Sequence, residues 1–172
     1  VPNDPIFQLT FPQRGMLDEE DFRRMRDLVA KGAPEAEIKL AADESHRLSR
    51  PITIHARSRQ SVRYAAEAGM DWIMHASFMD QPTLDIVLEK QIPICPAMTL
   101  LVNILEADDI GISDLPKGVR RHAEKERDAA IAILSKFHQS GGTLICGSET
   151  GFAMTPYGEW HTREMELFVK HL

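Results

Sequence analysis

The sequence predicts an α/β protein in which strands and helices alternate. Short apolar, β-branched runs begin near residues 52, 71 and 92, so they are spaced 19 and 21 residues apart. Segments with helical spacing of apolar residues lie between them, and this distance suits one strand, one helix and two loops. The runs are apolar almost throughout, which is typical of parallel strands buried on both faces.

Two helices are expected before the first strand. Residues 1–16 contain three prolines and read as an irregular connection. The segment 17–32 begins with acidic residues and ends at Gly32, which are start and stop signals for a helix. A second helix is expected from Pro34 to about Leu48, because proline suits the first helical turn.

Four strands with helices between them are expected from Pro51 onward. The strands are PITIHA, DWIMHAS, IPICPAM and TLICGSE, the last covering residues 143–149. The helices are QSVRYAAEAG up to Gly69, a segment from about 82 to 90, a long helix ending near His138, and a tail from about Glu159. The long helix carries an apolar face formed by Ala130, Ile133, Leu134 and Phe137, and its charged run RRHAEKERD is expected to be a solvated face.

Composition limits the classes of function. The 172 residues are 43% hydrophobic and 27% charged, as in ordinary globular proteins, and no apolar run approaches the roughly 18 residues of a membrane span. The net charge of -6 gives no electrostatic footprint for nucleic acid. Cys95 and Cys146 are too few for a disulfide framework and lie in apolar runs, so we expect buried thiols in a reducing compartment, the cytoplasm.

Polar residues recur where the apolar runs end. His55 closes the first run, His75 closes the second, and Glu149 follows the last. Right-handed crossovers allow an open doubly wound sheet or part of an eightfold barrel, and the glycine fingerprint of a nucleotide-binding open sheet is missing. In a barrel the carboxyl ends of the strands converge on one rim, where two imidazoles and a carboxylate can bind a divalent metal.

The segment HARSRQSVRYAAEAGMDWIMHASFMDQPTLDIVLEKQIPICPAM resembles strands five to seven of the amidohydrolase superfamily, in particular its imidazolonepropionase-like and prolidase-like metal-dependent hydrolases. GGTLICGSETG resembles the strand-eight segment, and GEWHTREMELFVKHL resembles the helix that follows it. The resemblance covers about residues 34–172. It implies that residues 1–172 are the C-terminal half of a (β/α)8 TIM barrel, strands five to eight with flanking helices, in which 1–33 form the lead-in and 34–172 the βα units.

The resemblance also implies roles for single residues. His55 and His75 are expected to be ligands of one or two divalent ions, with zinc the foremost candidate. Glu149 stands where the family carries a strand-eight Asp that moves protons during catalysis. Arg57 and His161 are expected to bind substrate, because a guanidinium suits a substrate carboxylate and His161 begins the helix after strand eight.

The function implied is metal-dependent hydrolysis of an amide or other C–N bond by metal-activated water, of the dipeptidase, cyclic-amide, carbamate or urea type. Two alternatives stay open: a phosphotriesterase or lactonase with a similar metal site, and a barrel that lost activity and serves as a binding or assembly subunit. The Glu in place of Asp favours the last one.

The partners expected are a small-molecule substrate and a complementary N-terminal half of the barrel. The family's strand-one H-x-H pair and bridging lysine of strand four are not among these residues. Half a barrel leaves sheet edges open, so we expect the chain to need the other half. Relatives commonly form oligomers, so a homo-oligomer is expected, with no nucleic-acid or membrane partner.

Overall fold

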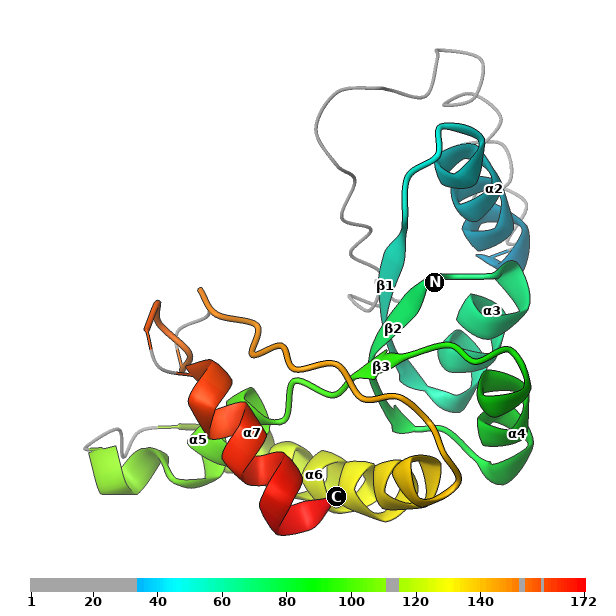
Figure 1. Cartoon of the computed structure of the whole chain (residues 1–172). Coiled ribbons are helices and arrows are strands. Elements are labelled where there is room, and N and C mark those ends of the chain that lie inside the picture. The colour runs from blue at the N-terminus through cyan, green and yellow to red at the C-terminus, as the bar shows by residue number, and fades with distance from the viewer. Residues whose placement is uncertain (1–33, 111–114, 152–153, 159) are drawn as a thin grey trace.

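Figure 1 shows the computed structural model of the chain, in which residues 34–110, 115–151, 154–158 and 160–172 are described. The lead-in and first helix predicted for residues 1–33 lie outside the described residues. The elements are α2 (Pro34–Arg47), β1 (Thr53–Ser58), α3 (Arg59–Ala68), β2 (Trp72–Phe78), α4 (Gln81–Glu89), β3 (Ile94–Cys95), α5 (Thr99–Leu105), the 3-10 helix η1 (Ala107–Ile110), α6 (Lys117–Gln139) and α7 (Trp160–His171).

The three strands form a parallel sheet in the order β1-β2-β3. Ile54, Ile73 and Ile94 occupy its centre and are fully buried, which is what continuous apolar runs require. The α/β class and the parallel sheet predicted from the sequence are therefore confirmed.

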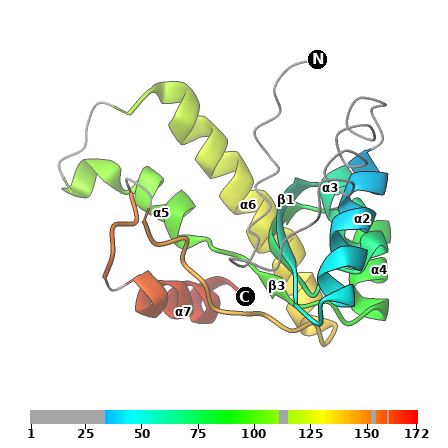
Figure 2. The ribbon, with the colours of Figure 1, turned by 90° about the horizontal axis from the view of Figure 1, so that it is seen from above.

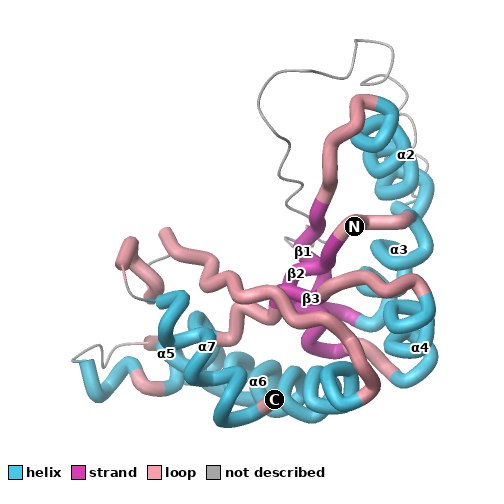
Figure 3. The backbone as a smooth tube through the Cα atoms, in the orientation of Figure 1, coloured by secondary structure: helices cyan, strands magenta, loops and turns pink. Residues whose placement is uncertain are grey.

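The prediction of a fourth strand over residues 143–149 is wrong in its length, because only Leu144 pairs with the sheet. One parallel bridge joins Leu144 to Ile94, with Ile145 N donating to Ile94 O at 2.8 Å. Pro93 and Pro96 flank β3 and cannot donate to a ladder, which limits β3 to two residues and leaves its neighbour little to pair with. The segment after Leu144 instead runs beside β3 as a loop (Figure 3).

The helices after β1 and β2 begin and end as their sequences dictate. Ser58 caps α3 by accepting from Ser61 N at 3.1 Å, and Asp80 caps α4 by accepting from Thr83 N at 3.1 Å. Gly69 ends α3 in the left-handed conformation with φ of 84°, which glycine adopts without strain.

The helices surround the sheet unevenly (Figures 1 and 2). α2, α3 and α4 lie next to one another on one side, while α5 and α7 lie across the molecule from them. The main core joins residues of α2, the strands, α3 and α4 to Ala130, Leu134 and Phe137 of α6. α5 was not expected from the sequence, because its seven residues are too short and too apolar to display a helical period.

The buried side of α6 is partly charged. Ala123, Glu126, Ala130, Leu134 and Phe137 are all buried, at helical spacing. The apolar face predicted for this helix is confirmed, but the prediction that residues 120–128 form a solvated face is wrong at Glu126. The Glu126 side chain lies on the same face of α6 as the apolar residues, so it is buried together with them.

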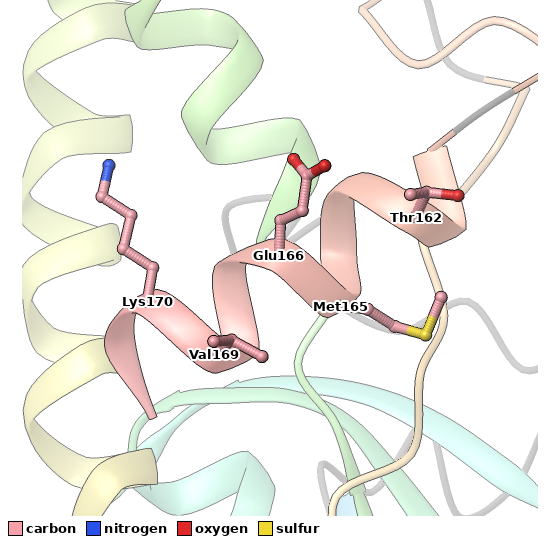
Figure 4. Close-up of a pocket in the computed structure, with 5 residues that line it drawn as sticks. All are labelled: Thr162, Met165, Glu166, Val169 and Lys170. Atoms are coloured by element: carbon pink, nitrogen blue, oxygen red, sulfur yellow. The ribbon is translucent and has the colours of Figure 1, made fainter.

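Two apolar side chains of α7, Met165 and Val169, point outward (Figure 4). Val169 is 92% exposed and Met165 50%, and with Thr162, Glu166 and Lys170 they line a surface depression. The residues that α7 buries are Glu164 and Leu167. An apolar stripe on a face without cover is the feature expected where another segment packs.

Two further predictions can be compared with the fold. Cys95 and Cys146 are free thiols, and Cys95 is buried as expected, whereas Cys146 is exposed because its segment is a loop rather than a buried strand. Among the described helices, none combines the length and apolarity that crossing a bilayer requires.

Glu164 joins α7 to the start of α5. Its carboxylate is fully buried and accepts from Met98 N at 2.9 Å, Thr99 N at 2.8 Å and Thr99 Oγ1 at 2.6 Å. Burial raises the pKa of Glu164, and these hydrogen bonds oppose that shift. The carboxylate thus satisfies backbone N–H groups that a helix start leaves without partners.

We expect Glu164→Ala to lower the free energy of unfolding by about 2–4 kcal/mol, since it leaves several buried donors unsatisfied. Urea unfolding followed by circular dichroism measures this. Glu166→Ala on the exposed side of the same helix is the control and should change stability by less than about 0.5 kcal/mol. Equal effects of the two substitutions would contradict a structural role for Glu164.

Candidate metal centre

The three predicted ligands come from three segments of the chain. His55 lies within β1, which runs on to Ser58, and His75 lies within β2, which runs on to Phe78. The two histidines therefore do not close their strands as the sequence suggested. Glu149 follows the bridge at Leu144 and lies in a loop.

The structure brings these side chains together. His55 Nδ1 lies 2.9 Å from His75 Nε2, and Glu149 Oε1 lies 3.3 Å from each of these nitrogens. The imidazole rings have centroids 5.0 Å apart and are tilted by 48°. Among the described residues, these three form the one group of His, Cys, Asp or Glu side chains with ligand spacing.

The pairing of β1 with β2 is irregular next to the point where the two imidazoles meet. The register pairs His55 with Met74 and Ala56 with His75, so regular alternation would point the two histidines to opposite faces. The register shifts between Ala56 and Ser58, where the partner on β2 changes from His75 to Phe78. Bulges of this kind commonly redirect a side chain beside a functional site.

The backbone around the site is strained. Four non-glycine residues there have left-handed conformations: His75 with φ of 75°, Ala76 with 53°, Ala97 with 50° and Glu149 with 50°. Such conformations cost about 1–3 kcal/mol each and persist where the surrounding structure imposes them. Two of the four are predicted ligands, so the strain falls on the residues whose direction decides the site.

A carbonyl fixes the tautomer of His75. His75 Nδ1 lies 3.2 Å from Pro96 O, and a carbonyl only accepts, so Nδ1 must carry the proton. In the neutral ring the lone pair is then on Nε2, which is the nitrogen that faces His55 and Glu149. Metal-ligating histidines are usually oriented by a contact of this type.

The donor set fits a divalent transition metal. Tetrahedral zinc with ligand distances of about 2.0–2.1 Å holds its ligand atoms about 3.3 Å apart, close to the separations found here. Glu149 Oε2 is buried and accepts no hydrogen bond from the described residues, although Arg57 Nη2 lies 3.7 Å away. Imidazole and carboxylate together suit zinc and its neighbours better than calcium or magnesium.

Burial and the local charges favour the metal-binding forms of two of the three candidate ligands, His55 and Glu149. Burial, together with the neighbouring His75, lowers the pKa of His55, which favours the neutral imidazole. Burial alone would raise the pKa of Glu149, but the hydrogen bond and charge of His75, with the charges of Arg57 and His55, lower it. The site therefore presents a neutral His55 and an ionised Glu149 near neutral pH.

Arg57 extends from β1 to a second carboxylate. Its Nη1 donates to Glu126 Oε1, and its Nη2 lies 3.7 Å from Glu149 Oε2. Ser77 also donates to Glu126 Oε1, at 2.8 Å, and His122 Nε2 lies 3.7 Å from Glu126 Oε2. One guanidinium thus stands between a buried acid of α6 and the candidate metal ligand.

Glu126 and Ser77 were missed by reasoning from the sequence. The signal for Glu126 was present, because it falls on the same helical stripe as Ala130, Leu134 and Phe137. A charged side chain on a buried helix face is stable only when a group of opposite charge or a hydrogen-bond donor is buried beside it. Ser77 gave no comparable signal, since its direction depends on the irregular end of β2.

The remaining candidate residue, His161, lies on α7 rather than on the sheet. His161 is exposed at the start of α7, and its carbonyl accepts from Cys146 Sγ at 3.5 Å. Substrate binding by Arg57 and His161 stays a prediction. Cys95 lies near the site, and burial foremost raises the pKa of its thiol to about 12, which keeps it protonated near neutral pH.

Comparisons with known proteins give matches in structure only. No protein-family model matches the chain, and a search of curated proteins gives no significant match. Among solved structures, an Xaa-Pro dipeptidase with bound methionine in its active site aligns over 80% of this chain and 33% of its own, with a TM-score of 0.67 and 20% identity. Ochratoxinase from A. niger aligns over 80% and 30%, with a TM-score of 0.68 and 20% identity.

A third solved structure, an amidohydrolase, aligns over 80% of this chain and 32% of its own, with a TM-score of 0.64 and 17% identity. Over the aligned residues, the chain shares its fold with these three solved structures. The resemblance predicted from the sequence is thus confirmed at the level of fold. The chain spans about a third of the length of these amidohydrolase-type structures.

We expect His55→Ala and His75→Ala each to lower the affinity for Zn²⁺ or Co²⁺ by more than about 100-fold, because each removes a ligand atom. Competition with a chromophoric chelator measures the affinity. His138→Ala is the matched control, since His138 is exposed on α6 and lies outside the three-residue group. Unchanged affinity in both ligand variants would show that the metal binds elsewhere.

Proposed function

We propose that this chain contributes a metal centre to a hydrolase of amide or other C–N bonds. The observation that carries the proposal is the convergence of His55 Nδ1, His75 Nε2 and Glu149 Oε1 within 3.3 Å of one another. The fold shared with a dipeptidase, an ochratoxinase and an amidohydrolase supports it. Dipeptides, cyclic amides, carbamates and ureas are the substrate classes to test.

Each residue has a distinct part in the proposed chemistry. His55 and His75 would hold a divalent ion, with zinc as the first candidate, which when bound supplies Lewis acidity and lowers the pKa of water. Glu149 is the proposed general base. Its lowered pKa keeps it ionised, and Oε2 accepts no hydrogen bond from the described residues, so this oxygen has lone pairs free to take a proton and return it to the leaving nitrogen.

The geometry argues against a barrel that has lost its base. A glutamate in place of aspartate extends the carboxylate by one methylene, which alone could misplace it. Here Glu149 Oε1 lies at the same distance, 3.3 Å, from both imidazoles, so the longer side chain still meets the ligand cluster. Glu149 reaches this position with a left-handed backbone conformation, with φ of 50°.

We expect Glu149→Gln to reduce hydrolysis by about 10²–10⁴-fold, the usual contribution of a general base. Glu149→Asp keeps the carboxylate and should retain more activity than the amide variant. Assays on dipeptides, cyclic amides, phosphotriesters and lactones also separate the proposed reaction from ester-cleaving alternatives. Full activity of Glu149→Gln on every substrate would rule out its role as base.

We further propose that this chain forms one half of a (β/α)8 barrel, corresponding to strands five to eight, and works with a segment that supplies strands one to four. The aligned part of this chain covers only 33% and 30% of the dipeptidase and ochratoxinase structures. In the described sheet β1 is an edge strand, and Val169 and Met165 expose an apolar stripe. Open sheet edges and exposed apolar stripes are surfaces that a second half would cover.

We expect the complete protein to be active and the 172 residues alone to be inactive, since the remaining ligands and substrate loops would be absent. Parallel measurements of hydrolysis and of zinc content on the two proteins test this. Adding the separately produced first half to the 172 residues should restore activity. Full activity of the chain by itself would contradict the half-barrel proposal.

A further inference from the structure

The charges beside Glu149 are unevenly paired. Arg57 is hydrogen-bonded to Glu126, yet its Nη2 stays 3.7 Å from Glu149 Oε2, which is beyond hydrogen-bond range. Glu149 Oε2 is itself buried without a hydrogen bond from the described residues. An ionised guanidinium and a buried carboxylate oxygen this close would ordinarily close into a bidentate pair, about 2.7–2.9 Å apart.

Glu126 accounts for the gap. It is 2% exposed, projects from α6 and accepts from both Arg57 and Ser77 through the same oxygen, Oε1. α6 packs against β2, so the Glu126 carboxylate is held next to the sheet that carries His55 and His75. A buried acid left without its cation costs several kcal/mol, so Glu126 holds the guanidinium firmly.

We infer that Glu126 is a positioning residue that restrains Arg57 from closing onto Glu149. The restraint keeps a positive charge near Glu149 while leaving both carboxylate oxygens free of Arg57 hydrogen bonds. Oε1 is then free to bind metal, and Oε2 is free to accept a proton. This inference rests on the proposed function, because it concerns what the Glu149 carboxylate is kept available for.

Removing the negative charge of Glu126 should lower the affinity of the site for metal. In Glu126→Gln the guanidinium loses its buried anion, and the nearest unsatisfied acceptor is Glu149 Oε2. A shift of about 1 Å would complete that pair. Arg57 would then compete with the metal ion for the Glu149 carboxylate, so metal affinity should fall even though no ligand has been changed.

The test measures Zn²⁺ affinity by chelator competition and the visible absorption of Co²⁺ in the complete protein. We expect Glu126→Gln to weaken Zn²⁺ binding by about 10–100-fold, as changes next to metal ligands usually do. Arg57→Gln should leave Zn²⁺ affinity within about threefold of the unsubstituted protein. The double variant should return to the Arg57→Gln value, because without the guanidinium nothing remains to be restrained.

The rescue separates positioning from a structural role. If Glu126 only stabilised the fold, the double variant would bind zinc no better than Glu126→Gln, and that result overturns the inference. Glu67→Gln is the matched control, since it neutralises the acid of the exposed Arg63–Glu67 pair and should not alter zinc affinity or the Co²⁺ spectrum.

A second variant covers failure to fold. If circular dichroism shows Glu126→Gln unfolded, Glu126→Asp keeps the charge but withdraws it by one methylene, and should weaken Zn²⁺ binding by about 3–10-fold with the same rescue by Arg57→Gln. Unchanged affinity in Glu126→Asp overturns the inference. No metal binding by the unsubstituted protein overturns the proposed function itself, whereas metal binding that is indifferent to Glu126 overturns this inference alone.

Discussion

The meeting of His55, His75 and Glu149 at one point is the constraint on which the rest of the structure depends. Three atoms with lone pairs lie within 3.3 Å of one another in a largely buried place. Polar atoms of this kind are costly to bury unless a proton or a cation is shared between them. A divalent ion satisfies all three, whereas a single proton shared between the imidazoles satisfies only His55 Nδ1 and His75 Nε2.

The fold sustains this arrangement at a cost in backbone strain. His75, Ala76, Ala97 and Glu149 hold left-handed conformations that glycine would adopt more easily. The elements around them are well packed, with Ile54, Ile73 and Ala76 all fully buried in the main core. Tight packing allows strain to persist, since relaxing one residue would open a cavity beside its neighbours.

The charged groups next to the candidate metal centre are Arg57, Glu126 and Glu149. Arg57 lies between two carboxylates, one on α6 and one in the loop after Leu144, and contacts them unequally. An ion pair between β1 and α6, Arg57–Glu126, thus lies beside the candidate ligands. Through Arg57, the tertiary structure connects Glu126 of α6, which is not a candidate ligand, with Glu149, which is one.

The sequence by itself determined the alternation of strands and helices, the parallel sheet and the identity of the three candidate ligands. Apolar runs at regular spacing and imidazoles near the ends of successive runs express local periodicity, which the chain carries in its order of residues. Only the tertiary structure decided that His75 turns to the face of His55, that Glu126 reaches Arg57, and that Cys146 is exposed in a loop. A bulge, a buried ion pair and a strand shortened by prolines depend on neighbours distant in the chain, and no local period records such contacts.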